Sequence, residues 1–128
     1  MIMSNTESRV VVTGMGVLSP LGLDVATTWN GLISGKSGID YITLFDTEPL
    51  ETKFGGEVKG FCATDFINRK DARRMDRFAQ LAVAASQQAM EQSGLQINSG
   101  NQNDIGIILG SGIGGLTTLF KQMQVLLE

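Results

Sequence analysis

The residues with the clearest potential for chemistry are the basic side chains gathered between positions 69 and 77. Five of the ten Lys and Arg residues lie in this short stretch, beside two aspartates, whereas the whole chain has a net charge of −3. Four of them are spaced i, i+3, i+4 and i+7, so on a helix they would share one face: Lys70, Arg73, Arg74 and Arg77. Such a face is either simply solvated or a docking surface for an acidic partner. An acidic protein fits better than nucleic acid, because the chain is acidic overall and Phe78 is the one aromatic side chain that interleaves with the cluster.

Residues able to act as nucleophiles or metal ligands are scarce. The sequence has no histidine and one cysteine, Cys62, which excludes a His-based triad, a Cys–His dyad and a His-ligated metal within it. No local histidine could activate Cys62, and the nearby loop carries Asp65, so we expect an inert thiol. We therefore expect no metal site and no His-activated nucleophile in this chain.

A glycine-rich turn follows a short apolar run near the end of the chain. Gly110, Gly112 and Gly115 match the spacing of a dinucleotide-binding fingerprint, in which glycines let the backbone approach a pyrophosphate. The acidic residue expected about 20 residues further on is missing from the sequence. The turn could instead be a tight strand-to-helix connection. In a third interpretation, the turn lets Ile113 face a substrate channel.

The elements that would position these residues alternate between strand and helix. The order of strand, helix, irregular excursion, helix, strand and helix is typical of an α/β fold. We expect strands at 9–13 and 105–109, a short strand within 53–58, and helices at 25–34, 71–92 and 116–127. Asp24 is the expected N-cap of the first helix and Gly35 its stop.

Length and composition allow one domain of ordinary globular type. The chain has 128 residues, of which 42% are hydrophobic and 18% charged. Residues 1–8 are expected to form a flexible arm without the features of a secretory signal, and 9–128 a single domain. No apolar run is long enough to span a membrane, and the single cysteine fits the cytoplasm. Two strands cannot make a stable sheet alone, so we expect a truncated domain.

Several ordered motifs resemble the β-ketoacyl-acyl carrier protein synthases. The likeness covers the chain from about Arg9 onward, and Ile113 is similar to the synthase II type rather than the synthase I type. The segments that carry it are 9–22, Trp29, 34–39, 45–47, 69–76 and 110–115.

The resemblance implies a thiolase-like fold of αβαβα layers, of which this chain would be the first part. It also implies an acyltransferase, a 3-oxoacyl-ACP synthase that elongates acyl chains by decarboxylative Claisen condensation with malonyl-ACP in fatty acid biosynthesis. Polyketide condensing enzymes share the pattern. The family's nucleophilic cysteine, in an Ala-Cys turn, and its two histidines lie beyond this sequence, and Cys62 does not match that cysteine. The resemblance thus implies no catalytic residue and no cofactor in this chain, and we expect the chain to be inactive alone.

Two groups of functional residues carry over by position from the resemblance. Lys70, Arg73 and Arg74 match basic residues that receive the acidic helix of acyl carrier protein, and Ile113 matches a residue of the acyl pocket. The implied partner is acyl carrier protein, with a homodimer for the complete enzyme and neither nucleic acid nor membrane. Two alternatives stay open: a dinucleotide-binding domain built on Gly110, Gly112 and Gly115, and a non-catalytic module that binds an acidic protein.

Overall fold

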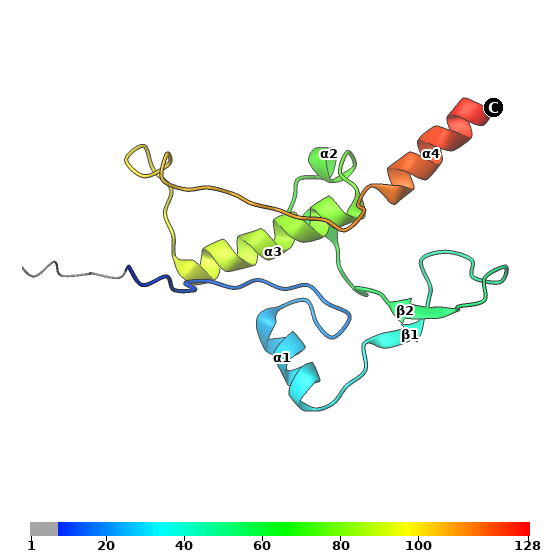
Figure 1. Cartoon of the computed structure of the whole chain (residues 1–128), viewed down its shortest axis with the longest axis horizontal. Coiled ribbons are helices and arrows are strands. Elements are labelled where there is room, and N and C mark those ends of the chain that lie inside the picture. The colour runs from blue at the N-terminus through cyan, green and yellow to red at the C-terminus, as the bar shows by residue number, and fades with distance from the viewer. Residues whose placement is uncertain (1–7) are drawn as a thin grey trace, which may run out of the picture.

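The structure is a computed structural model that describes residues 8–128 (Figure 1). The rest of the expected N-terminal arm, residues 1–7, lies outside the described residues. Figure 1 shows α3 at the centre, with α1 and the strand pair on one side, α2 on the other, and α4 projecting beyond the end of α3. The elements are α1 (Val25–Ile33), β1 (Ile39–Tyr41), β2 (Phe54–Gly56), the 3-10 helix η1 (Ala63–Asp65), α2 (Arg69–Ala72), α3 (Arg77–Ser93) and α4 (Leu116–Leu127).

Helix α1 forms where its end signals predicted it. The carboxylate of Asp24 accepts a 2.7 Å hydrogen bond from the backbone N–H of Thr27, as an N-cap does. This bond holds the pKa of Asp24 below its ordinary value, because it favours the charged form. After the C-cap residue Ser34, Gly35 turns into the left-handed region at φ +68° and ends the helix.

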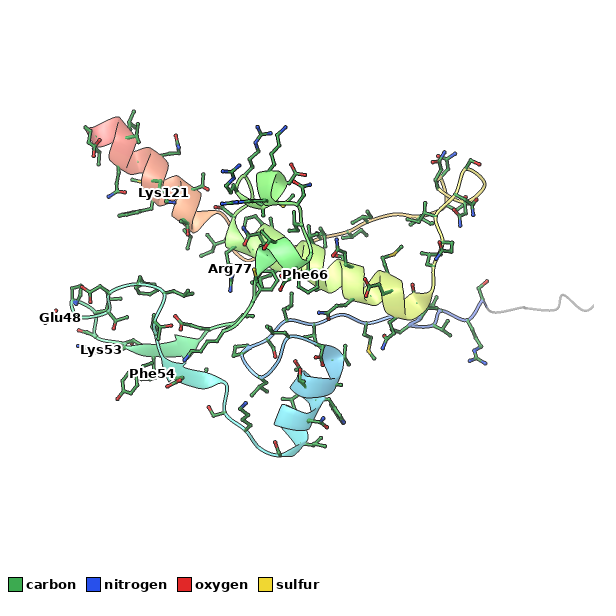
Figure 2. All side chains as sticks on the ribbon, turned by 180° about the vertical axis from the view of Figure 1, so that it is seen from behind. Glu48, Lys53, Phe54, Phe66, Arg77 and Lys121 are labelled. Atoms are coloured by element: carbon green, nitrogen blue, oxygen red, sulfur yellow. The ribbon has the colours of Figure 1, made fainter. Side chains whose placement is uncertain are left out.

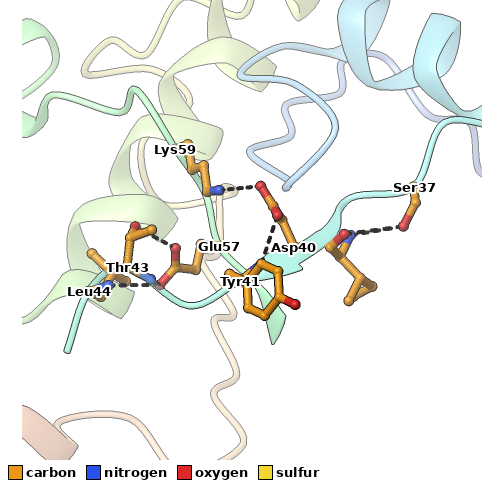
Figure 3. A network of polar contacts seen from close by, with 8 residues as sticks. Ser37, Asp40, Tyr41, Thr43, Leu44, Glu57 and Lys59 are labelled. Carbon is orange, nitrogen blue, oxygen red and sulfur yellow. Dashed lines mark hydrogen bonds and ion pairs between the residues drawn. The ribbon is translucent and has the colours of Figure 1, made fainter. Parts of the chain in front are cut away.

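The expected strand within 53–58 is confirmed as β2, and its partner β1 was not anticipated. The two strands pair antiparallel, with Ile39 opposite Gly56 and Tyr41 opposite Phe54. The polar contacts beside this pair are drawn in Figure 3. Glu57 accepts hydrogen bonds from the backbone N–H groups of Thr43 and Leu44, at 2.9 and 3.0 Å, and from the Thr43 hydroxyl at 2.8 Å. The carboxylate thereby fastens the loop after β1 to the residue that follows β2.

An exposed ion pair lies next to this loop. The ammonium of Lys59 is 2.7 Å from the carboxylate of Asp40. The pairing lowers the pKa of Asp40 and raises that of Lys59, because each charge favours the other. Partial removal from water would raise the pKa of Glu57, but the hydrogen bonds from Thr43 and Leu44 outweigh that effect and lower it.

The single helix expected at 71–92 is wrong: the segment forms two helices, α2 and α3, separated by a turn at 73–76. Asn68 caps α2 by accepting a 3.0 Å hydrogen bond from the N–H of Asp71. The amide of Gln80 donates to the carbonyls of Ala72 and Met75, at 2.8 and 3.1 Å. These carbonyls lie at the end of α2 and in the turn, so Gln80 compensates for helical bonds that the turn interrupts. The extended backbone of Asp76, at ψ 158°, then begins α3.

The two strands expected at 9–13 and 105–109 are also wrong, because neither segment forms a strand. A strand needs a hydrogen-bonded neighbour, and within residues 8–128 the one sheet is the pair β1–β2. Figures 1 and 2 show the two segments running along opposite sides of α3. Their apolar side chains are accordingly exposed, as at Val10 and Ile108, which are 98% and 97% exposed. The buried hydrophobic core described in the chain is small: Phe61, Ile67, Ala72 and Ala84.

The first extended segment lies directly against α3 because it carries two glycines there. A Cβ on Gly16 would overlap the carbonyl oxygen of Ala85 and lie 2.8 Å from the Cβ of Gln88. The same Gln88 accepts a 3.0 Å hydrogen bond from the N–H of Val17 and donates a 2.7 Å bond to the carbonyl of Leu23. Gly14 lies equally close to α3, because a Cβ there would overlap the carbonyl oxygen of Ala89. The glutamines of α3 thus satisfy backbone groups of a segment that has no strand partner.

No helix within residues 8–128 has both the length and the apolar character needed to cross a bilayer.

Candidate functional site

The basic residues predicted to dock a partner are exposed, but they do not share the face of one helix. Lys70 lies on α2, Arg73 is the C-cap of that helix, and Arg74 lies in the following turn. Figure 2 shows side chains around α2 extending away from α3. The correction follows from the helix break, which replaces helical spacing after Ala72 with a turn. The three cations stay close in the chain and accessible to a partner.

Arg77, the fourth member of the predicted helical face, has a structural role instead. Its guanidinium donates to the carbonyls of Val58 and Phe61, at 2.9 and 3.4 Å. It also lies over the ring of Phe61, 4.7 Å from the centroid, in a cation–π contact. That ring stacks on Phe66 with centroids 5.8 Å apart. Arg77 therefore holds the segment before η1 against α3.

A cleft of about 260 Å³ lies between the turn at 73–76 and α4. The cationic side chains of Arg73 and Arg74 line it from the turn, and Lys121 lines it from α4. Sequence reasoning missed Lys121, which is the one basic residue after Arg77 and is distant in sequence from the cluster. No local pattern links positions so far apart, so only the fold reveals that they line one cleft.

Asp76 connects this turn to the start of α4. Its carboxylate accepts a 2.6 Å hydrogen bond from the hydroxyl of Thr118, in the first turn of α4. A Cβ on Gly115 would lie 3.1 Å from the other carboxylate oxygen of Asp76. A negative charge near a helix N-terminus is favourable, because the exposed N–H groups carry partial positive charge. Asp76 therefore helps to set where α4 leaves the body.

The glycine turn around Ile113 takes its left-handed backbone from its last two glycines. Gly114 has φ +61° and Gly115 has φ +65°, a conformation that other residues adopt with strain. A Cβ on Gly114 would come within 3.2 Å of the ring of Phe78, so this position also needs a close approach. By contrast, a Cβ on Gly110 or Gly112 would meet nothing within 4 Å among the described residues.

Ile113 itself is 79% exposed beside that turn. A mostly apolar cleft of about 260 Å³ lies nearby between α3 and the glycine-rich segment, lined in part by Phe78, Ala82, Leu109 and Gly110. Ile113 is absent from the described lining of this cleft. The described chain therefore presents Ile113 as an open apolar surface on a glycine-rich connection.

Among the residues that the structure describes, Cys62 has no partner of the kind that would activate a thiol. Its sulfur lies 3.1 Å from the hydroxyl of Thr64, and the side chain is exposed. The sequence contains no histidine that could act as its base. Over residues 8–128, no three Cys, Asp or Glu side chains come together as a candidate metal site.

Comparison with known proteins identifies the class to which these features belong. Residues 7–128 match the model of the β-ketoacyl synthase N-terminal domain, so the chain belongs to the β-ketoacyl synthase family. It is 50% identical over 127 residues to a 3-oxoacyl-[acyl-carrier-protein] synthase 2 of Synechocystis. It is 49% identical over 123 residues to the synthase of that name from Vibrio cholerae. These matches cover 98% and 96% of this chain but 30% of each relative.

A solved structure gives the same assignment of fold. The ishigamide ketosynthase/chain length factor superposes with a TM-score of 0.63 at 36% sequence identity, over 75% of this chain and 23% of that one. The predicted α/β, thiolase-like fold is thus confirmed, as a partial domain. The chain spans less than a third of the length of the relatives it matches.

Proposed function

We propose that this chain is the N-terminal part of a 3-oxoacyl-ACP synthase of the synthase II type, an acyltransferase of fatty acid biosynthesis. The observation that carries the proposal is the family match over residues 7–128, together with about 50% identity to synthases of that name. We also propose that the complete protein is a cytoplasmic homodimer without a cofactor. A dinucleotide-binding role for Gly110, Gly112 and Gly115 gains no support from these relatives, which are all named as synthases or ketosynthases.

In the proposed reaction, a cysteine thiolate attacks an acyl thioester on the carrier protein, and the carrier's thiol leaves. Malonyl-ACP then loses CO2, and the resulting carbanion attacks the acyl-cysteine carbonyl. The new carbon–carbon bond forms as the cysteine thiolate is expelled, so the chain grows by two carbons. This chemistry needs an activated nucleophile and two histidines, and this sequence has no histidine. We assign those residues to the rest of the protein and none of them to Cys62.

The proposed contribution of this chain is to receive the carrier protein. Lys70, Arg73 and Arg74 are exposed cations around the end of α2, and a carrier protein presents an acidic helix. Each exposed ion pair contributes only about 0.2–1 kcal/mol to the binding free energy. Charges of this kind therefore act mainly by raising the association rate and by selecting the partner. The second contribution is Ile113, which we propose forms part of the wall of the acyl pocket.

Charge reversal tests the docking role directly. The variant Lys70→Glu/Arg73→Glu/Arg74→Glu of the full-length protein is compared with Lys36→Glu/Lys53→Glu, which reverses two lysines outside this surface. Three lost pairs predict carrier binding about 3- to 150-fold weaker at low salt, by the ~0.2–1 kcal/mol range per pair. The deficit should shrink in high salt, because exposed charges are screened. Equal affinity and equal salt dependence in all three proteins would remove the dock from this surface.

A further inference from the structure

We propose that Lys121 of α4 forms one cationic cleft with Arg73 and Arg74, so that the acidic partner is held from two separate elements. This inference rests on the proposed function, since it takes the carrier protein as the occupant. It adds to that function a contact that neither the helical spacing nor the resemblance indicated.

The first support is the shared cleft. Arg73 and Arg74 line the cleft of about 260 Å³ from the turn between α2 and α3, and Lys121 lines it from the opposite element, α4. Figure 2 labels Lys121 on the part of α4 that is nearer to the body. The two arginines and Lys121 belong to two segments that lie more than forty residues apart in the sequence. The fold brings these segments to two sides of one cleft.

The second support is the charge that this cleft leaves uncompensated. The one ion pair within residues 8–128 is that of Lys59 with Asp40, so Arg73, Arg74 and Lys121 have no acidic partner there. Asp76 is the single acidic residue that lines the cleft, and its carboxylate already accepts the hydroxyl of Thr118. The positive charges on the two sides of the cleft repel each other. An anionic group bound between them would offset this repulsion, so the arrangement favours an acidic partner.

The third support is the way α4 is attached. The hydrogen bond of 2.6 Å between Thr118 and Asp76 joins α4 to the same turn that carries Arg73 and Arg74. Lys121 follows Thr118 by three residues, so it lies about one helical turn further along the same side of α4. A contact between two residues of the cleft lining thus helps to set the position of Lys121 relative to the arginines.

Charge reversal of Lys121 in the full-length protein tests the inference. Lys121→Glu is compared with Lys53→Glu, whose lysine lies in the loop between β1 and β2, away from the cleft (Figure 2). Affinity for the carrier protein is measured by titration at low and high ionic strength, and the melting temperature of each variant shows whether it is folded. We expect Lys121→Glu to bind about two- to fivefold more weakly at low salt, with most of the loss removed at high salt. Lys53→Glu should bind as the unmodified protein does.

The outcomes separate this inference from the proposed function. If reversal of Lys70, Arg73 and Arg74 weakens binding while Lys121→Glu matches Lys53→Glu, the dock stands and the cleft with Lys121 is refuted. If neither the triple variant nor Lys121→Glu changes affinity, the proposed function of the basic surface fails with it. Weakening by Lys121→Glu that persists unchanged at high salt would also refute the inference, because a charge contact between exposed groups is screened.

Discussion

The hydroxyl of Thr118 donates a 2.6 Å hydrogen bond to the carboxylate of Asp76, and this contact joins two segments 42 residues apart. Asp76 is the last residue of the turn that separates α2 from α3, and Thr118 lies in the first turn of α4. The contact therefore links the basic surface to the helix that follows the glycine-rich turn. The side chain of Asp76 therefore helps to position α4 relative to the turn that carries Arg73 and Arg74.

Replacing Thr118 by valine tests this link, because valine keeps the shape of threonine and removes the hydroxyl. We expect amide hydrogen exchange at Leu119, whose N–H donates to the carbonyl of Gly115, to become about fivefold faster, which corresponds to the loss of about 1 kcal/mol. Thr117→Val is the matched control, since the hydroxyl of Thr117 makes no hydrogen bond within residues 8–128. Equal protection in both variants would show that the contact with Asp76 does not hold α4.

Alanine at position 16 should disturb the contact between the N-terminal segment and α3. The added Cβ would overlap the carbonyl of Ala85, and backbone atoms move aside only at a cost. Gly16→Ala should lower the free energy of unfolding by about 1–3 kcal/mol, as overpacking does. Gly112→Ala is the control, because a Cβ there meets nothing within 4 Å among the described residues. Denaturant titration measures both, and a Gly16→Ala protein as stable as the control would contradict the close approach.

Acid should weaken the hydrogen bonds by which Glu57 holds the loop after β1. The hydrogen bonds from Thr43 and Leu44 lower the pKa of Glu57 in the folded protein, against the opposing effect of its partial removal from water. A group with a lowered folded pKa stabilises the fold above its unfolded pKa, about 4.3, and loses that effect as pH falls through the folded pKa. The melting temperature should therefore fall more between about pH 5 and pH 3 in the unmodified protein than in Glu57→Gln. Glu51→Gln serves as the control, and parallel pH profiles for all three proteins would rule out this role of Glu57.

The elements that could be predicted from the sequence are those whose signals are local. Helix α1 has its N-cap, Asp24, and its stop, Gly35, at its two ends, and both act as predicted. Helix α4 follows the spacing of its apolar residues over 116–127, as predicted. The N-cap of α2 also carried a local signal, because Asn68 precedes a charged helical turn, although the prediction placed the helix start later.

The features that could not be predicted depend on distant partners. The break after α2 is stabilised by Gln80 through its side chain, a contact that leaves no periodic trace. The apolar runs at 9–13 and 105–109 look like buried strands, but a strand exists only where a second backbone pairs with it. Lys121 enters the basic cleft because α4 is attached at Asp76, which no spacing around Lys121 indicates.

The chain by itself should form no acyl-enzyme. The exposed thiol of Cys62 has the Thr64 hydroxyl as its neighbour at 3.1 Å, and no histidine exists in the sequence to take its proton. After incubation of the 128-residue chain with acyl-ACP, intact-mass spectrometry should find no added acyl group. Cys62→Ser in the full-length protein should retain full condensation activity within about twofold. An acyl adduct that disappears in Cys62→Ser would overturn the assignment of the nucleophile to the rest of the protein.

Ile113 should influence which acyl chains the complete enzyme accepts. It is a β-branched apolar residue followed by two glycines with left-handed backbone. The connection around it therefore has few other side chains, and Ile113 is exposed there. In the full-length protein, the proposed pocket role predicts that Ile113→Phe takes up part of the acyl pocket while leaving room for a short chain. Transfer of long acyl chains should then fall at least tenfold relative to short ones, the scale on which a few methylenes are discriminated in an apolar pocket. The measurement is kcat/KM for acyl-ACP substrates of increasing length, with Ile113→Val as the conservative control. Equal losses of kcat/KM for long and short acyl chains would place Ile113 outside the pocket. A residue that affects only the stability of the protein would lower kcat/KM for all chain lengths alike.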